Sequence, residues 1–323
     1  MIDMPYTIQT RVTEILGIQY PFLQGAMAWI TGWEIAAAVS NAGGLGTIAS
    51  AILKPEEIVD EIKQTKEATD RPFAVNIPIR LAGSEEAIEV AIAEKVPVVV
   101  TSTGDPMIYT ERLHKAGIMV FQVAFSLDMV DRCNDAHVDA VIVMGSEAGG
   151  NLGPAELTTM VLVPQAVRKT GLPVIAAGGI GDGRGFVAAL ALGAEGIQMG
   201  TRILATRECT VHGRYKEAVL KARDTDTTVT GRTTGLEFRV LKNSLSREIL
   251  DMERDQRDRD EIDSVAIGGL RRAAEEGDVE HGSVMMGQIS GMISDVLPVK
   301  ELFEKIMSDA SHRVHGISGL FHP

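Results

Sequence analysis

Two glycine-containing segments of this chain could bring several backbone N–H groups into one small region. Residues 174–177 form an apolar run that ends at Gly178 and Gly179, and residues 196–199 form a second run that ends at Gly200 and Thr201. An apolar, alanine-rich helix is expected between them, over 186–192. Unpaired N–H groups beside a helix start favour negative charge, and only glycine lets the backbone approach a ligand so closely. The pattern therefore predicts a phosphate site.

A glycine pair after a strand also has a simpler interpretation, because it often marks nothing more than a tight strand-to-loop turn. In this chain the second glycine-containing strand end follows the first after roughly twenty positions. Such a pair of ends is typical of the phosphate pocket that follows the last two strands of an eight-stranded α/β barrel. The pairing favours the phosphate site over the plain turn.

The elements that would position this site are short apolar runs alternating with helical stretches. Strands are predicted at 21–24, 45–50, 73–77, 96–102, 118–124, 140–144, 174–177 and 196–199. Helices are predicted at 33–41, 55–69, 84–94, 105–116, 126–136, 158–169, 186–192 and 299–307. Continuous apolar strands are expected where both faces of a parallel sheet are covered. The fold class is α/β, and the architecture is a TIM (β/α)8 barrel.

The alternation stops after Thr201 and gives way to a charged segment from about 208 to 282. The run DMERDQRDRDEID predicts a solvated helix, and scattered apolar positions around it predict a small, mostly helical subdomain. We expect residues 208–282 to be a lid inserted over the carboxyl face of the barrel. The barrel itself would comprise residues 1–207 and 283–323, ending in a surface tail from 312.

Composition narrows the classes of protein. The formal net charge of -13 argues against nucleic acid and anionic membranes as partners. Cys133 and Cys209 lie in dissimilar surroundings, and no histidine–carboxylate spacing suggests zinc, so neither a disulfide framework nor a metal site is predicted. The first residues lack the apolar core of a secretory signal, and no apolar run is long enough to cross a membrane. A cytoplasmic location is the expectation.

The carboxyl ends of the predicted strands would form a glycine-lined, weakly charged cavity with the phosphate site at one end. These ends read QGAMAW, NAGGLG, VNIP, TSTG, GSEAGG, AAGGI and QMGT. A planar cofactor with a single phosphate fits such a cavity, and FMN is the candidate.

Several of these segments, with YKEAVLKARDTDTT and GSVMMGQISG, occur in the order found in a known family. The chain resembles the flavin-dependent enoyl-ACP reductase II (FabK-type) enzymes and their relatives, the nitronate monooxygenases, once called 2-nitropropane dioxygenases. The resemblance covers nearly the whole chain. It implies an FMN-containing TIM barrel with an inserted lid.

The resemblance also implies positions for the flavin contacts. Ring contacts fall on the first and third strand ends, further contacts on the sixth strand end, phosphate contacts on the last two strand ends, and a cover over the ring on a returning segment. In that order the residues are Gly25, Ala26, Met27, Ala28 and Asn76; Met144, Glu147 and Gly149; Gly178, Gly179, Gln198, Met199, Gly200 and Thr201; Met286, Gly287 and Gln288. Met27 and Met286 could instead be ordinary core residues, and Asn76 could merely cap a turn.

Asn151 departs from the family pattern, because both branches usually carry histidine immediately after EAGG. That histidine resembles a base that removes a carbon-bound proton or steadies an anionic substrate, and asparagine cannot take up a proton near neutral pH. Asn151 could polarise an enoyl carbonyl as a catalytic residue, or it could be a plain loop residue. Two other side chains, His212 and His281, flank the inserted segment and could face the cavity.

The expected function is reduction of the double bond of a 2-enoyl thioester, most plausibly enoyl-ACP, by NADH or NADPH through bound FMN. No dinucleotide-binding fingerprint is seen, so the nicotinamide and the acceptor would visit the same flavin face in turn. The lid would supply part of the pantetheine and nicotinamide surface. Nitronate monooxygenase, NAD(P)H:quinone reductase and a flavin-binding protein without turnover remain alternatives. Expected partners are a small-molecule or carrier-bound enoyl substrate and a second copy of the chain in a homodimer.

Overall fold

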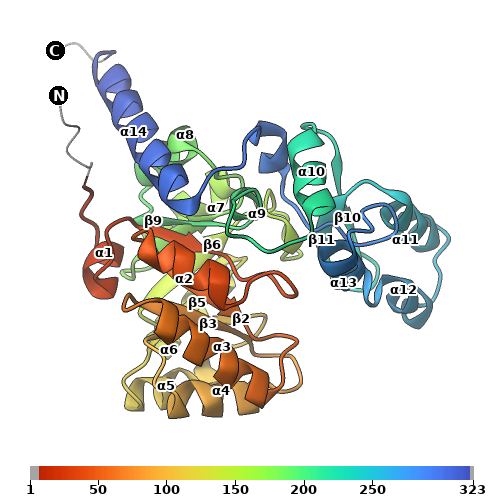
Figure 1. Cartoon of the computed structure of the whole chain (residues 1–323), viewed down its shortest axis with the longest axis horizontal. Helices are drawn as coiled ribbons and strands as arrows, with labels where there is room; N and C mark the ends of the chain where they lie inside the picture. The colour runs from red at the N-terminus through yellow and green to blue at the C-terminus, as the bar shows by residue number, and fades with distance from the viewer. Residues whose placement is uncertain (1–6, 321–323) are drawn as a thin grey trace.

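Eight parallel strands surrounded by helices form the body of the protein in the computed structural model, which describes residues 7–320 (Figure 1). The strands are β1 (Phe22–Gln24), β2 (Gly46–Ala49), β3 (Phe73–Pro78), β4 (Val98–Ser102), β5 (Met119–Ala124), β6 (Ala140–Met144), β8 (Val174–Ala177) and β9 (Gly196–Met199). Each agrees with a predicted strand to within two residues. The predicted TIM barrel is confirmed. Residues 1–6 and 321–323, which belong to the predicted amino-terminal segment and surface tail, lie outside the described residues.

The sheet runs in the order β1-β9-β8-β6-β5-β4-β3-β2 and closes between β1 and β2. Leu23 and Leu45 form a parallel bridge at this seam. The buried side chain of Gln24 adds to it, because its Oε1 accepts a hydrogen bond of 2.7 Å from the Thr47 N–H. A polar side chain thus extends the backbone hydrogen bonds between the short strands β1 and β2.

Alternate residues of each strand face the barrel interior and the helices. Leu23, Val98, Val100, Phe121 and Ile175 belong to the interior cluster of apolar side chains. Their neighbours along the strands pack outward against the helices in a second, larger layer. Two residues beyond the last interior residue of a strand, the next inward-facing side chain projects into the mouth of the barrel at the carboxyl ends of the strands.

The helices cover the outside of the sheet. They are α2 (Trp33–Asn41), α3 (Pro55–Ala68), α4 (Ser84–Ala93), α5 (Thr110–Lys115) after the 3-10 turn η1 (Pro106–Ile108), α6 (Leu127–Ala136), α7 (Thr159–Lys169), α8 (Gly183–Ala191) and α14 (Val299–Ser318). The long helix α14 packs against α8 and α2 (Figure 1). It reaches beyond the predicted end at 307, so most of the predicted tail is exposed helix.

Two helix starts show what the apolar pattern missed. Helix α8 begins three residues before the predicted start, because Asp182 caps it and accepts a hydrogen bond of 2.9 Å from the Gly185 N–H. Helix α1 (Arg11–Leu16) was not predicted, although Thr10 and Thr13 form a capping box at its start.

The inserted segment contains more than helices. It holds α10 (Gly213–Lys221), α11 (Ser244–Arg254), α12 (Arg259–Ala266), α13 (Gly269–Arg271) and the π-helical turn η2 (Arg272–Glu276), together with strands β10 (Thr227–Thr230) and β11 (Phe238–Leu241). These strands pair antiparallel with each other, and β11 also pairs with β7 (Gly150–Asn151), which lies in the loop after β6. The segment therefore hydrogen-bonds to the barrel at its carboxyl end and lies beside it in Figure 1.

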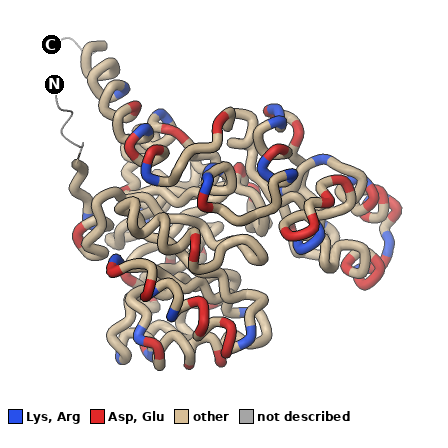
Figure 2. Tube along the Cα trace, in the orientation of Figure 1, with Lys and Arg blue, Asp and Glu red and all other residues tan. Residues whose placement is uncertain are grey.

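Acidic and basic residues are interspersed along the helices α11 and α12 (Figure 2). A small apolar cluster of Leu245, Ile249 and Ile262 joins these two helices on their inner side. The mixed-charge run is thus a pair of solvated helices rather than one, broken between Asp255 and Asp258.

Candidate active site

The ends of β8 and β9 lie side by side, because the two strands are hydrogen-bonded neighbours with Ala177 opposite Gln198. Gly178 and Gly179 both have positive φ, at 93° and 73°. Within residues 7–320, the N–H groups of Gly178, Gly179, Gly200 and Thr201 donate no hydrogen bond to any protein acceptor. We call these four residues the phosphate cradle.

The donors of the cradle suit the phosphate of FMN, and close packing requires glycine at position 178. A Cβ on Gly178 would lie 2.8 Å from the Gly145 oxygen, so a larger residue would push the turn apart. The Thr201 Oγ1 accepts a hydrogen bond of 2.9 Å from the Gly287 N–H, which leaves its own proton free to donate to a ligand. Gly178, Gly179 and Gly200 are half-buried, and unpaired N–H groups at such positions suit an anionic ligand.

The returning segment around Gly287 is clamped onto two strand ends. This segment donates two hydrogen bonds. One runs from the Gly287 N–H to Thr201, and the other runs from the Gln288 N–H to the Glu147 oxygen over 2.9 Å. Gly149 and Gly287 face each other at this junction: a Cβ on Gly149 would lie 2.5 Å from the Met286 carbonyl carbon, and one on Gly287 would lie 2.5 Å from the Glu147 oxygen. Two glycines are needed here because backbone packs on backbone.

The carboxylate of Glu147 is engaged with the scaffold. It accepts hydrogen bonds from the Thr159 N–H, at 2.9 and 3.1 Å, and so caps the start of α7. The Thr159 Oγ1 also lies 2.9 Å from the Gly178 oxygen, which links α7 to the phosphate cradle. Thr159 was not among the residues that the sequence predicted for the site. Its position at the start of a predicted helix was the signal that could have indicated it.

Three predicted site residues project into the mouth of the barrel. By the strand alternation, Asn76 and Met144 follow interior residues of β3 and β6. Gln198 of β9 pairs with the interior residues Leu23 and Ala177 of the neighbouring strands. The Asn76 Nδ2 donates to the Val100 oxygen over 2.9 Å and to the Ser102 Oγ over 3.3 Å. Its Oδ1 accepts no hydrogen bond within the described chain and is available to a ligand. Ser102 occupies the same layer on β4 and was missed.

The segment after β1 forms one wall of this mouth. A Cβ on Gly25 would lie 3.5 Å from Gln198 Nε2, and one on Gly200 would lie 3.9 Å from the Met27 Sδ. Ala26 and Ala28 are half-buried between them. Trp29 follows with φ at 64° and lies under the Arg271 guanidinium of the inserted segment, 5.6 Å from its ring centroid. The structure thus brings this segment next to β9 and the insertion.

Other predicted residues lie elsewhere. The side chain of Met199 packs outward in the helix layer, Met286 is fully buried in the same layer, and Gln288 is exposed. The half-buried Met285, the residue before Met286, has its Sδ 3.6 Å from the position of a Cβ on Gly150. Met286 is surrounded as an ordinary core residue is, which was the alternative to a flavin contact.

Asn151 sits on β7, opposite Phe238 of β11. Its half-buried side chain makes no hydrogen bond to any other residue in the 7–320 range. The chain on both sides of Asn151 is hydrogen-bonded to the inserted segment. The Arg239 Nε donates to the Ser146 oxygen over 2.9 Å, and the Leu152 N–H donates to the Glu237 oxygen over 2.9 Å. Burial lowers the pKa of the Arg239 guanidinium, and Arg232 nearby lowers it further. The small sheet therefore holds Asn151 rigidly while leaving its amide free.

The two histidines considered for the cavity have other roles. His212 caps α10, and its Nδ1 accepts a hydrogen bond of 3.1 Å from the Arg214 N–H. His281 is exposed and lies 3.3 Å from Asp278. No group of three metal-binding side chains occurs among the described residues, and none of their helices is long and apolar enough to span a membrane.

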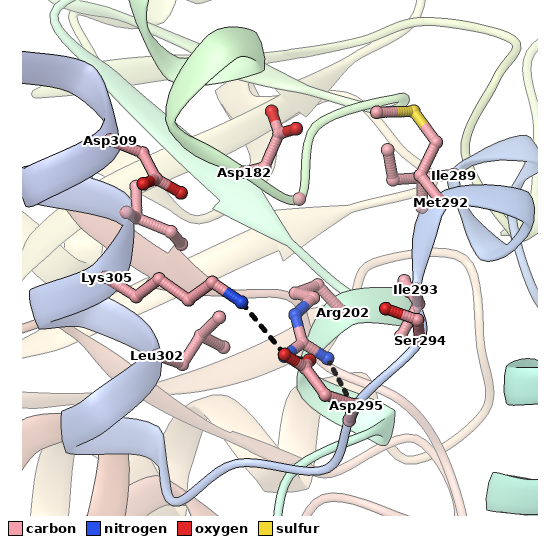
Figure 3. Close-up of a pocket in the computed structure, with 12 residues that line it drawn as sticks. Asp182, Arg202, Ile289, Met292, Ile293, Ser294, Asp295, Leu302, Lys305 and Asp309 are labelled. Carbon is pink, nitrogen blue, oxygen red and sulfur yellow. Dashed lines mark hydrogen bonds and ion pairs between the residues drawn. The ribbon is translucent and has the colours of Figure 1, made fainter. Parts of the chain in front are cut away.

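A pocket lies behind the phosphate cradle, between α8, α14 and the segment that follows the 3-10 turn η3 (Gln288–Met292) (Figure 3). Arg202, buried directly after Thr201, donates to the Asp295 Oδ1 over 2.6 Å and to the Asp295 backbone oxygen over 3.1 Å. Lys305 of α14 binds the other Asp295 oxygen at 2.9 Å. Asp295 therefore ties the cradle to the last helix.

This ion-pair network predicts an acid-sensitive contribution to stability. Partial burial raises the pKa of Asp295, but Lys305 and Arg202 together outweigh it and hold the pKa below its ordinary value. A lowered pKa in the folded state stabilises the fold above the unfolded value of about 3.9 and is lost as the pH falls through the folded value. Asp295→Asn should lower the free energy of unfolding at neutral pH, and the difference from wild type should shrink below about pH 4.

Urea unfolding at several pH values measures this difference. Glu304→Gln removes one carboxylate of an exposed pair with Lys300, 4.0 Å apart, and is the matched control, because such pairs contribute little. An Asp295→Asn deficit that stayed constant down to pH 3 would exclude the charge as its origin.

The fold and the candidate site together are typical of barrels that bind a phosphate-bearing cofactor at the carboxyl ends of their strands. A model of the family described as nitronate monooxygenase matches residues 9–87 and 77–309. The chain belongs to this family, and it is a flavin-dependent oxidoreductase.

Three relatives illustrate the range of the family. The structure of FabK from Thermotoga maritima superposes with a TM-score of 0.95 at 43% identity, covering 98% of this chain and 100% of that one. A probable nitronate monooxygenase of Staphylococcus saprophyticus is 33% identical over 94% of this chain and 98% of its own length. The (3aS,4S,5R,7aS)-5-hydroxy-7a-methyl-1-oxo-octahydro-1H-indene-4-carboxyl-CoA dehydrogenase of Mycobacterium tuberculosis is 33% identical over 97% and 99%.

Proposed function

We propose that this protein uses FMN and NADH or NADPH to reduce the 2,3 double bond of an enoyl thioester, with enoyl-ACP as the first candidate. The observation that carries the proposal is Asn151, a rigidly placed amide without a protein partner where the family usually has histidine. An amide can donate a hydrogen bond to a thioester carbonyl, but it cannot remove a carbon-bound proton.

The chain's own residues have distinct tasks in this scheme. The phosphate cradle would bind the cofactor's phosphate through backbone N–H groups, and Asn76 would offer its free amide oxygen at the opposite rim of the mouth. Bound FMN supplies a centre that accepts hydride from a nicotinamide and delivers it to an electron-poor carbon. Asn151 would hold the thioester carbonyl and stabilise the negative charge that develops on its oxygen. Water or another donor would supply the final proton.

Two relatives support a thioester substrate. FabK shares 43% of its residues with this chain, and the mycobacterial relative is named as a dehydrogenase of a carboxyl-CoA, which is itself a thioester. The inserted segment would provide the surface for the carrier arm and for the nicotinamide. A homodimer is compatible with the proposal and is not required by it.

Nitronate oxidation is the second candidate, because the family model and the staphylococcal relative carry that name. The missing histidine counts against it. NAD(P)H:quinone reduction and flavin binding without turnover remain less favoured, since neither gives Asn151 a role.

Anaerobic stopped-flow absorbance distinguishes these functions. NADH or NADPH should bleach the visible band of the bound flavin, and crotonyl thioester should restore it, in two separate steps of a ping-pong reaction. Bleaching by propyl nitronate without a nicotinamide would reverse the assignment. Reoxidation by quinones but not by the thioester would favour the quinone reductase, and a yellow protein inert to all of them would be a binding protein.

A further inference from the structure

The small sheet that carries Asn151 has one packed face and one open face. On the packed face, Leu152 and Val229 are buried in a single apolar cluster. Successive side chains of a strand point to opposite faces, so Asn151, which precedes Leu152, and Phe238, which pairs with Asn151, lie on the other side. Both are only half-buried. The face that carries Asn151 is therefore the one that a ligand can reach.

An array of neighbouring side chains occupies this open face. Asn151 lies directly opposite Phe238 of β11. The next residue of β11 on the same face, Val240, lies opposite Met285 of the returning segment. Directly opposed residues of an antiparallel pair stand about 5 Å apart on the same face. Asn151 thus has apolar side chains across the sheet and along it.

Phe238 and Met285 lack the packing that large apolar side chains usually have. Both are half-buried, and neither belongs to an apolar cluster of residues 7–320. Large apolar side chains that stay partly exposed beside each other commonly mark a binding surface, because a bound apolar group removes their area from water.

The array also lies next to the segment that reaches the phosphate cradle. Met285 stands two residues before Gly287, whose N–H donates to the Thr201 Oγ1 over 2.9 Å. The Met285 Sδ lies 3.6 Å from the position of a Cβ on Gly150, the residue before Asn151. The open face of the small sheet is thereby connected to the cofactor end of the site.

The chemistry of the array indicates which part of a substrate it would bind. The alkyl chain of an enoyl thioester is apolar, whereas the carrier arm carries amides and a nicotinamide dinucleotide carries phosphates, and these groups need polar partners when they are buried. Phe238, Val240 and Met285 offer none. A chain whose carbonyl is held by Asn151 would have its next carbons within reach of Phe238, which is about 5 Å away across the sheet.

We propose that Phe238 is a specificity-determining residue that packs against the alkyl chain of the enoyl thioester, with Val240 and Met285 continuing the same surface. The inference rests on the proposed function, in which Asn151 holds the thioester carbonyl. It assigns the chain-length preference of the enzyme to the inserted segment and the returning segment rather than to the barrel strands.

The test measures kcat/KM for the crotonyl, 2-hexenoyl and 2-octenoyl thioesters of coenzyme A with the full-length, flavin-loaded protein. In wild type, kcat/KM should rise with chain length, because each buried methylene adds binding free energy. Phe238→Ala should lower kcat/KM about tenfold for 2-octenoyl, the equivalent of roughly two buried methylene groups, but less than about threefold for crotonyl. Phe238→Leu should restore most of the loss. The kcat/KM for the nicotinamide should not change, because a ping-pong reaction reduces the flavin before the thioester binds.

Val229→Ala is the matched control, because it removes apolar volume from the packed face of the same sheet. It should lower the melting temperature and change kcat/KM by the same factor for every chain length. A wild-type enzyme indifferent to chain length, or an equal loss for all thioesters in Phe238→Ala, would overturn the inference and leave the proposed function intact. Failure of every thioester to reoxidise the wild-type flavin would instead refute the proposed function, and the inference with it.

Discussion

Asn151→His is expected to oxidise 2-nitropropane about a hundredfold faster than wild type. The substitution places an imidazole on the rigid strand β7, where the family usually carries one, and a positioned general base contributes rate factors of about this size. Only the neutral imidazole can take the proton from carbon, so the gain should increase as the pH rises through about 6.5, the ordinary pKa of histidine. Oxygen consumption with 2-nitropropane, measured across this pH range, gives the result.

Asn151→Gln is the control for this prediction, because it keeps an amide and offers no base. It should show no gain with 2-nitropropane. If Asn151→His behaved like Asn151→Gln at every pH, residue 151 would lie away from the reacting carbon. The role proposed for Asn151 with thioesters would then fail with it.

Gly149→Ala is expected to lower the free energy of unfolding by about 3 kcal/mol and to yield protein that retains no flavin. The added methyl group would lie 2.5 Å from the Met286 carbonyl carbon and 2.6 Å from the Gly287 nitrogen. Both are backbone atoms, so no side chain can move aside. The returning segment must shift, and the bonds from Gly287 to Thr201 and from Gln288 to Glu147 lengthen or break.

Urea denaturation and the ratio of visible to ultraviolet absorbance measure the two effects. Gly171→Ala is the matched control, since a Cβ there meets no atom within 4 Å and its φ is not positive. A yellow Gly149→Ala protein of normal stability would show that the returning segment can move without cost. It would also remove the argument that this junction shapes the phosphate cradle.

The sequence predicted the barrel well because its strands are apolar runs between glycines and prolines, a signal that is local. Strands β10 and β11 gave no such signal: TTVT and FRVL are short, and they are defined by pairing with each other and with two residues far away in the chain. The capping residues at the starts of α1 and α8 can be recognised in the sequence, but the apolar pattern alone did not indicate them.

The geometry of the candidate site was predictable only in part. Glycines at strand ends pointed to the phosphate cradle, whereas Ser102 and Thr159 are ordinary residues in sequence and become notable only through hydrogen-bond partners that are distant in the chain. Adjacent methionines illustrate the limit. The sequence favoured Met286 at the site, while the fold buries Met286 and leaves Met285 against Gly150. The individual flavin contacts remain predictions.

The hydrogen bonds that hold the returning segment at Gly287 have a consequence for the order in which parts of the chain fold during synthesis. Thr201 and Glu147 leave the ribosome well before the segment that they hold, which is separated from Thr201 by the whole insertion. A nascent chain can thus form all eight barrel strands and still lack the segment that hydrogen-bonds to Thr201 of the phosphate cradle. Loading of the vitamin-derived group is expected to be a late event in biogenesis, after the insertion has folded.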